Sequence, residues 1–339
     1  MEIEALMKNL NLGDVLEPPR QIKGGLLHRM YCVNTTKGTY AVKVLNSEIM
    51  KRKSALQNMI NSEKIAALLA QTVPAVVSLE IDESQIHKLD GIYYMVFPWV
   101  EGKSVFSSEI TVKHCEIIGD FLGCIHRQNI TLEGLEKEYD AINMYDWTND
   151  LEMAEKISPS EKWTVQYKKA VHDIERWNHR VCDVEDILAK HMVISHRDLD
   201  PKNVMWNDGQ AYIIDWEAAG YVNPYQELLE VINYWTDDGK GNLCKEKFDA
   251  LLTAYKKHIS LDDVDWSAVL DAGFSSMLGW LSYNVKRALG IEISDESERK
   301  EGIRQVQVTI EELYNYQKKM KCLKEWLEHV SMNTKWLCR

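Results

Sequence analysis

Several features that would place a chain at a membrane or in a secretory pathway are missing from this 339-residue sequence. It has no apolar run approaching the roughly 18 to 20 residues that a membrane-spanning helix needs. Residues 1–4 lack the basic region and apolar core of a secretory signal. No Ser-, Gly- or Pro-rich linker, internal repeat or low-complexity run divides the chain. These absences predict a cytoplasmic protein without membrane association, and the length fits one unit of two lobes.

Cysteine usage and net charge exclude further classes. The seven cysteines are an odd number and include no Cys-x-x-Cys pair, which favours a reducing cytoplasm over a disulfide scaffold or a zinc site. The formal net charge of −12 argues against a nucleic-acid partner, because nucleic-acid phosphates are met by a basic surface. The same charge suits a cationic small molecule, although many cytoplasmic proteins are acidic for solubility alone.

Two apolar runs in the second half of the chain end at polar residues. The run 192–194 leads into a segment that contains Asp198 and, five residues later, Asn203, whereas the run 211–214 ends at Asp215. Between them stands Asn207-Asp208-Gly209, which is typical of a hairpin turn, so the two strand ends should lie side by side. Taken singly, each segment could be an ordinary strand end.

Together these residues have the spacing that phosphoryl transfer from ATP needs. That reaction rests on orienting the acceptor and neutralising phosphate charge with metal ions. Asp198 could orient the acceptor hydroxyl and accept its proton, while Asn203 and Asp215 offer the oxygen ligands that Mg²⁺ prefers. We expect His196 to hold this loop by hydrogen bonds instead of acting as the base, and His126 to be structural.

The motif resembles the catalytic and metal-binding loops of the aminoglycoside phosphotransferase and choline kinase family, relatives of the protein kinases. Gly220, Pro224 and Glu227-Leu228 are similar to the pattern that follows the metal aspartate in that family. Two positions depart from it, because Arg197 and Asp200 stand where the family usually has Gly and His. A protein kinase acting on serine or threonine would be expected to carry Lys at position 200, and no long activation segment follows, so a protein substrate is disfavoured.

The resemblance implies an α+β, bilobal protein-kinase-like fold. Its small, mostly antiparallel β N-lobe would span 1–96, its hinge 97–102 and its large helical C-lobe 103–339. Helical periodicity in the sequence predicts helices within 3–16, 54–71, 111–127, 163–188, 266–289 and 301–330.

A strand lysine is the main signal in the N-terminal part. Alternation in 39–45 places Lys43 on the same face as apolar neighbours, where an ammonium group needs a partner. By the resemblance, Lys43 contacts the phosphates of ATP and Glu63, on the helix within 54–71, pairs with it. The alternative for Glu63 is a solvated helix charge. Gly24 and Gly25 separate two short β-like runs and are implied in cofactor binding, although most such pairs are plain turns.

The stretch 91–102 reads as a strand that passes into an extended connector, where a kinase hinge would hold adenine. Proline has no N–H, so Pro98 cannot donate a hydrogen bond. This leaves the Phe97 carbonyl and the Trp99 N–H as the expected adenine-binding pair. The competing interpretation is an ordinary strand exit with proline as a breaker.

Acceptor contacts are predicted from carboxylates and aromatics, because both attract cations. The candidates are Asp200, Glu227, Glu230 and Trp235, with a further cluster at 143–150. Tryptophans in helices more often fill cores, and acidic runs are often solvated faces.

The sequence therefore predicts an ATP- and Mg²⁺-dependent kinase of a small, cationic, aminoglycoside-like hydroxyl compound. Choline, homoserine or a sugar-derived alcohol are alternative acceptors, and a nucleotide-binding regulatory pseudokinase is an alternative of another class. A role in antibiotic resistance and one in metabolism both stay open, as does the oligomeric state.

Overall fold

The computed structural model describes residues 2–22, 28–139, 142–291, 293 and 295–334. The chain forms two compact units. The first, here called the sheet unit, comprises residues 1–136 and 194–220, and the second, the helical unit, comprises residues 137–193 and 221–339. Both boundaries near the middle of the chain fall within short strands, β6 (Val193–Ser195) and β9 (Gly220–Val222).

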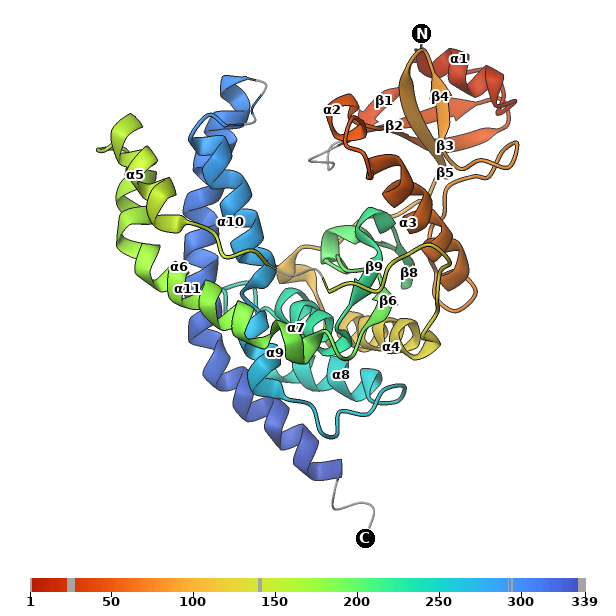
Figure 1. The fold of residues 1–339 in the computed structure, drawn as a ribbon. Helices are drawn as coiled ribbons and strands as arrows, with labels where there is room; N and C mark the ends of the chain where they lie inside the picture. Colours follow the sequence, from red (N-terminus) through yellow and green to blue (C-terminus); the bar gives the residue numbers. More distant parts are fainter. Residues whose placement is uncertain (1, 23–27, 140–141, 292, 294, 335–339) are drawn as a thin grey trace. The chain divides into compact units, whose positions relative to one another are not determined.

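The sheet unit is built on a five-stranded antiparallel sheet of order β1-β2-β3-β5-β4. Its strands are β1 (Arg20–Ile22), β2 (Arg29–Thr35), β3 (Gly38–Val44), β4 (His87–Leu89) and β5 (Ile92–Pro98). Helix α1 (Glu2–Asn9) lies against this sheet in Figure 1. It buries Ile3, Leu6 and Met7 among the apolar side chains of β2, β3 and β5, because these three residues recur at helical spacing on one face. The small antiparallel sheet expected from the sequence is confirmed.

Two helices follow the sheet's third strand. They are α2 (Ser47–Met50) and α3 (Ala55–Leu69), and α3 buries one face that includes Ile65, Ala66 and Leu69. After α3, the segment that leads to β4 makes backbone hydrogen bonds with a distant hairpin. The Val76 N–H donates to the Ile213 carbonyl at 2.8 Å, and the Ile213 N–H donates to the Pro74 carbonyl at 2.9 Å.

That hairpin consists of β7 (Val204–Asn207) and β8 (Gln210–Ile213), joined as predicted by a two-residue turn. Asp208 and Gly209 have φ values of 47° and 80°, the positive values that this tight turn requires. The hairpin is also tied to the segment after β5, where the Lys103 and Trp206 backbones exchange hydrogen bonds. A Cβ atom on Gly102 would lie 2.5 Å from the Trp206 carbonyl oxygen, so glycine is required there.

These hydrogen bonds explain why residues 97–103 and residues 196–213 belong to the same compact unit as the sheet. Helix α4 (Val112–Gln128) completes the sheet unit, with three short 3-10 turns: η1 (Ser107–Glu109), η2 (Pro201–Asn203) and η3 (Trp216–Ala218). The division into lobes at residues 97–102 that the sequence suggests stays a prediction. The compact units are divided at other positions, after residues 136, 193 and 220.

The helical unit contains the remaining helices, and in Figure 1 its α10 and α11 run side by side. Its members are α5 (Trp147–Ile157), α6 (Lys162–Leu188), α7 (Pro224–Trp235), α8 (Lys245–Tyr255), α9 (Trp266–Ala272), α10 (Ser275–Ala288) and α11 (Glu296–Thr334). Its core includes Trp177 of α6, whose ring stacks on Phe274 with centroids 5.1 Å apart. The single helix expected within 266–289 is wrong, since it is interrupted at Gly273 and Phe274. A Cβ atom on Gly273 would clash with the Tyr316 side chain.

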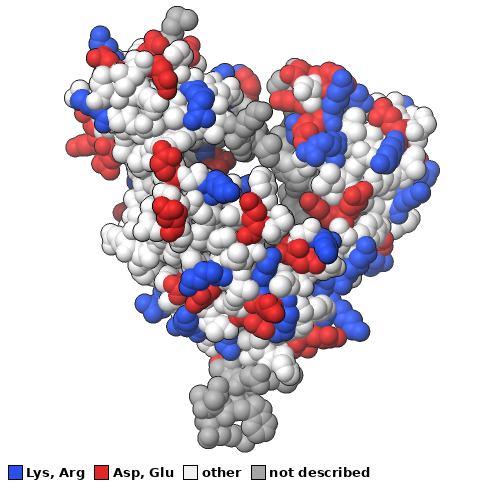
Figure 2. Space-filling model, turned by 180° about the vertical axis from the view of Figure 1, so that it is seen from behind, with Lys and Arg blue, Asp and Glu red and all other residues white. Residues whose placement is uncertain are grey.

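The surface carries charges of both signs. On the face that Figure 2 shows, Lys and Arg side chains are interspersed with Asp and Glu and form no continuous basic stripe among the coloured residues. Within the described part of the chain, no helix is both long and apolar enough to cross a bilayer.

Candidate active site

The loop that carries the candidate catalytic residue Asp198 begins where β6 ends, at the buried residue His196. The Asp198 backbone N–H donates to His196 Nδ1 (3.2 Å), so the ring proton of the neutral side chain lies on Nε2, which is 3.1 Å from the Ile214 carbonyl oxygen. His196 thus links the loop to the end of β8, which confirms its predicted structural part. Arg197 and Asp215 both have positive φ values, of 66° and 60°. Such backbone is uncommon for residues other than glycine and is often found at functional sites.

Asp198 and Asn203 are in direct contact. The Asn203 amide Nδ2 donates to Asp198 Oδ2 (2.8 Å) and to the Asp198 backbone carbonyl (2.9 Å). Burial raises the pKa of Asp198, while the nearby Lys202 ammonium, 3.4 Å away, acts in the opposite direction. Because a carboxylate can only accept, this contact fixes the amide orientation of Asn203 and directs its Oδ1 away from Asp198.

Asp200 stabilises the turn between these two residues. Its Oδ1 accepts a hydrogen bond from the Lys202 N–H (2.8 Å), and its backbone carbonyl accepts one from the Asn203 N–H (2.9 Å). The side chain that we considered for acceptor binding therefore caps η2 in this structure.

Lys43, on β3, reaches the end of β8. Its Nζ lies 2.8 Å from Asp215 Oδ1 and 2.5 Å from Glu217 Oε2. Burial would lower the pKa of Lys43, but the two carboxylates outweigh it and the pKa is raised. For Asp215, burial would raise the pKa, but the charge of Lys43 and its hydrogen bond outweigh it and the pKa is lowered. Lys43 and Asp215 are therefore charged, and the side chains of Asp215 and Glu217 share one ammonium group.

The predicted pair of Lys43 with Glu63 is not formed. Glu63 is buried on α3, and its Oε2 accepts hydrogen bonds from the Ser78 N–H (2.8 Å) and the Ser78 hydroxyl (2.6 Å). Burial raises the pKa of Glu63, against the effect of these bonds and of the Lys43 charge. The alternative of a solvated helix charge is also wrong. Lys43 instead donates to Asp215 and Glu217, whereas Glu63 accepts from Ser78.

Two residues of this cluster escaped the sequence analysis. Glu217 follows Asp215 by two positions, and η3 brings its carboxylate back to Lys43. His28, directly before β2, is buried and places Nε2 3.4 Å from Glu217 Oε2. Burial lowers the pKa of His28. Glu217 could have been found from the sequence, because Asp215 and Glu217 place an acid on each side of Trp216. A single histidine before a strand, such as His28, gives no comparable pattern.

The hinge prediction needs correction. The Trp99 N–H donates to the Thr39 carbonyl oxygen (3.3 Å) and is therefore used within the sheet unit. Phe97 is paired with Ala41 of β3. Backbone groups alternate sides along a strand, and the Tyr93 carbonyl accepts from Leu45, after β3, while the Val96 carbonyl accepts from Leu79. The backbone N–H and C=O groups of the odd-numbered residues thus face β3. The Phe97 carbonyl and the Trp99 N–H therefore do not face outward, as the predicted adenine-binding pair would have to.

Three further predicted site residues belong to α7 of the helical unit. Glu227 and Trp235 are buried on α7 within the helical unit, with exposed fractions of 1% and 0%, so Trp235 does not present an open face to a cation. Glu230 is half-buried on the same helix. Gly24 and Gly25 fall outside the described residues.

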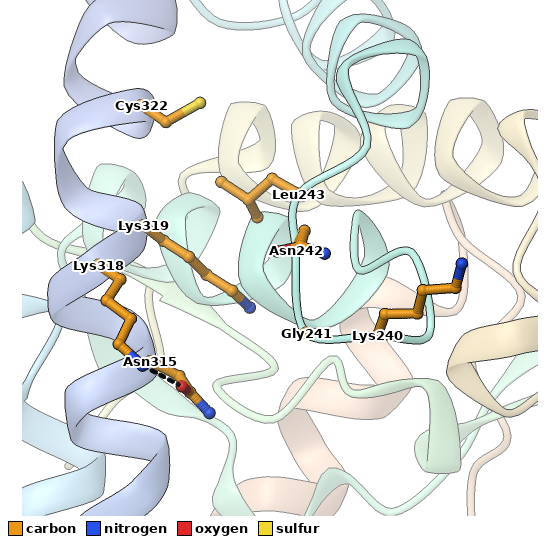
Figure 3. A pocket seen from close by; sticks show the side chains of 8 residues that line it. All are labelled: Lys240, Gly241, Asn242, Leu243, Asn315, Lys318, Lys319 and Cys322. Atoms are coloured by element: carbon orange, nitrogen blue, oxygen red, sulfur yellow. Dashed lines mark hydrogen bonds between the residues drawn. The ribbon is translucent and has the colours of Figure 1, made fainter.

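A cavity of about 470 Å³ lies within the helical unit, between the loop after α7 and α11 (Figure 3). In Figure 3, Lys319 extends from α11 towards this loop, while Lys240 points away from α11. The Lys319 Nζ is 3.4 Å from Asp237 Oδ2, and Lys318 donates to Asn315. None of the candidate site residues lines this cavity. Its full lining is Lys240, Gly241, Asn242, Leu243, Asn315, Lys318, Lys319 and Cys322.

Within the sheet unit, a lysine on β3 contacts Asp215 and Glu217, the two acids that follow the β7–β8 hairpin. The family described as the phosphotransferase enzyme family (APH) matches residues 19–260, and the chain belongs to this family. It is accordingly an enzyme of the small-molecule O-phosphotransferase class. No protein in a search of curated proteins matches the sequence.

Solved structures share the protein-kinase-like fold at low sequence identity. A spectinomycin phosphotransferase in complex with ADP and spectinomycin is 14% identical, with a TM-score of 0.69, over 92% of this chain and 98% of its own. An amicoumacin kinase in complex with AMP-PNP and Ca²⁺ is 13% identical, with a TM-score of 0.61, over 92% and 94%. A choline kinase from Cryptosporidium parvum is 13% identical, with a TM-score of 0.53, over 91% and 92%. The predicted fold class is thereby confirmed.

Proposed function

We propose that this protein transfers the γ-phosphate of ATP, with Mg²⁺, to a hydroxyl group of a small and cationic molecule. The main support is the arrangement within the sheet unit, where Lys43 meets Asp215 and where Asp198 meets Asn203. The Ile214 N–H donates to the Asn203 carbonyl (2.9 Å), which brings the two pairs next to each other. Phosphoryl transfer needs this combination of a positioned acceptor base and groups that handle phosphate charge.

The donor atoms fit a magnesium ion. Asp215 and Glu217 are carboxylates, and Asn203 has a carbonyl Oδ1 that is directed away from Asp198. Oxygen donors of this kind suit Mg²⁺. Two carboxylates around one ammonium also leave an excess negative charge that a divalent cation would balance. When bound, the ion supplies neutralisation of the phosphate charge.

The residues of the chain would then divide the work. Asp198 orients the acceptor hydroxyl and accepts its proton, for which a raised carboxyl pKa makes it a better base than an ordinary aspartate. Lys43 releases its carboxylate partners and contacts the phosphates of the nucleotide. Glu63, now held by Ser78, is close enough for its pKa to respond to the Lys43 charge, and it would steady Lys43 after that release.

For adenine, we propose the Pro98 carbonyl and the Val100 N–H. Since odd-numbered residues of β5 face β3, the extended chain turns the polar groups of 98 and 100 to the opposite side. Proline can serve at position 98, because its carbonyl accepts the hydrogen bond from adenine and its missing N–H is not used.

Replacing Val100 with proline removes that N–H and is expected to raise the Kd for ATP by roughly 2- to 13-fold, the worth of one hydrogen bond of about 0.5 to 1.5 kcal/mol. Val100→Ala keeps the N–H and serves as the matched control, with a Kd close to that of the unchanged enzyme. Titration of a fluorescent ATP analogue against each protein measures both values. Equal affinity of the proline and alanine variants would contradict the proposed hinge contact.

The acceptor class rests on charge and on the relatives. The net charge of −12 favours a cation, and the similar structures include a spectinomycin phosphotransferase and an amicoumacin kinase as well as a choline kinase. We therefore favour an aminoglycoside-like compound. Choline, homoserine and sugar-derived alcohols are the other acceptors that this reaction type would admit.

The function is tested by ADP release from Mg-ATP in the presence of spectinomycin, aminoglycosides, choline, homoserine, methylthioribose or a generic protein substrate. The Asp198→Asn variant is the blank. We expect acceptor-dependent ADP from one small-molecule class. ADP release with the protein substrate alone would overturn the proposal. Mg²⁺-dependent ATP binding without turnover across a wide panel would favour a regulatory pseudokinase.

A further inference from the structure

His28 is held at both ring nitrogens. The Asn46 backbone N–H donates to Nδ1 (3.0 Å), and Nε2 lies 3.4 Å from Glu217 Oε2. The side chain is almost fully buried, with 6% of the residue exposed. Asn46 also caps α2, where its side chain accepts from the Glu48 N–H (2.9 Å), so the backbone group that holds the ring is itself fixed.

These contacts determine the tautomer of the ring. A backbone N–H can only donate, so Nδ1 carries the lone pair and the proton of the neutral imidazole lies on Nε2. The protonated Nε2 is therefore the ring atom that lies 3.4 Å from Glu217 Oε2. His28 is thus placed beside Glu217 as an outer partner is placed beside a metal ligand.

The contact between His28 and Glu217 matters when Lys43 leaves Glu217 to bind the nucleotide. Glu217 has two described partners, Lys43 and His28. If Lys43 turns to the phosphates, His28 is the partner that stays, because its ring is fixed by Asn46 and does not follow the nucleotide.

We propose that His28 is a positioning residue that keeps the Glu217 carboxylate at the magnesium site while Lys43 is engaged with nucleotide. The inference deepens the proposed function and rests on it. Without this contact, Glu217 would have to be ordered by the ion alone, so the apparent affinity for Mg²⁺ would fall while the reacting groups stay in place.

Three substitutions separate the two ring contacts. In His28→Gln, the amide nitrogen takes the place of Nε2 and can donate to Glu217. In His28→Asn, the shorter amide can accept from the Asn46 N–H but does not reach Glu217. His28→Leu makes neither contact at similar volume. The Asn and Gln variants thus form a matched pair that differs in the Glu217 contact.

We expect the Mg²⁺ concentration for half-maximal turnover to rise about 10- to 100-fold in the Asn and Leu variants, the usual effect of losing an outer partner of a metal ligand. The Gln variant should stay close to the unchanged enzyme, and kcat at saturating Mg²⁺ should change little in the Asn–Gln pair. Binding of Mn²⁺, followed by its electron paramagnetic resonance signal with AMP-PNP present, should show the same order without relying on turnover.

An Asn variant that binds Mn²⁺ as well as the unchanged enzyme would overturn the inference. The inference would also be overturned if His28→Gln bound Mn²⁺ as weakly as His28→Leu, provided that thermal unfolding without ligand shows both variants folded. If His28→Leu does not fold, the comparison of Mn²⁺ binding by His28→Asn and His28→Gln alone tests the inference. The proposed function is judged separately, because its failure would appear as absent Mn²⁺-dependent nucleotide binding in the unchanged enzyme.

Discussion

Replacing Asp198 with asparagine is expected to lower acceptor-dependent ADP formation by roughly 10²- to 10⁴-fold, the range of general base catalysis. Asparagine keeps the shape of the side chain, and its carbonyl can still accept from the Asn203 amide, which now bonds Asp198 Oδ2 at 2.8 Å. It cannot take up the proton of the acceptor hydroxyl. Affinity for Mg-ATP should be unchanged, because Asp198 faces the acceptor in the proposed arrangement.

Asp208→Asn is the matched control for this experiment. Asp208 is exposed in the β7–β8 turn with a φ of 47°, and asparagine tolerates such backbone. The control should retain full turnover. A rate for Asp198→Asn above a tenth of that of the unchanged enzyme would argue against Asp198 as the base.

Replacing Asp215 with asparagine is expected to abolish the stabilisation that Mg-ATP gives the folded enzyme. A ligand present at 100 times its Kd adds about 2.7 kcal/mol to the free energy of unfolding. The variant should lose this gain along with turnover, since Asp215 supplies a carboxylate for Mg²⁺ and one of the two partners of Lys43. Asparagine is chosen because the φ of 60° at this position would strain alanine.

Thermal unfolding with ATP, with and without Mg²⁺, measures the effect. The ligand-free variant should remain folded, because Glu217 still pairs with Lys43 at 2.5 Å. Asp208→Asn again controls for the loss of one carboxylate. If Asp215→Asn kept the full Mg²⁺-dependent shift, the assignment of the metal site would be wrong.

Local elements were largely predictable because the signals that set them are close together in the sequence. The turn at Asp208 and Gly209 is fixed by residues that accept positive φ. The contact between Asp198 and Asn203 spans only five residues and follows from one short loop. The break near Gly273 was missed. At that position a Cβ atom would clash with Tyr316, which is far away in the sequence.

The hinge shows how one strand register changes a functional prediction. The absence of an N–H on Pro98 was evident from the sequence, but which neighbours face outward depends on pairing with β3. The Thr39–Trp99 hydrogen bond reverses the expected choice. A register difference of one residue exchanges the two sides of a strand. The local sequence therefore does not predict which backbone groups pair with β3 and which face outward.

The sequence alone determined the reaction class of this protein, because phosphoryl transfer demands a base, an amide and a carboxylate at short, recognisable spacings that one loop and one hairpin supply. Only the tertiary structure decided the partners of Lys43. Glu63 and Glu217 offer the same carboxylate chemistry, yet Ser78 holds the first while η3 brings the second to the ammonium group. Hydrogen bonds act over about 3 Å, so the choice between chemically equal groups distant in sequence is made by packing.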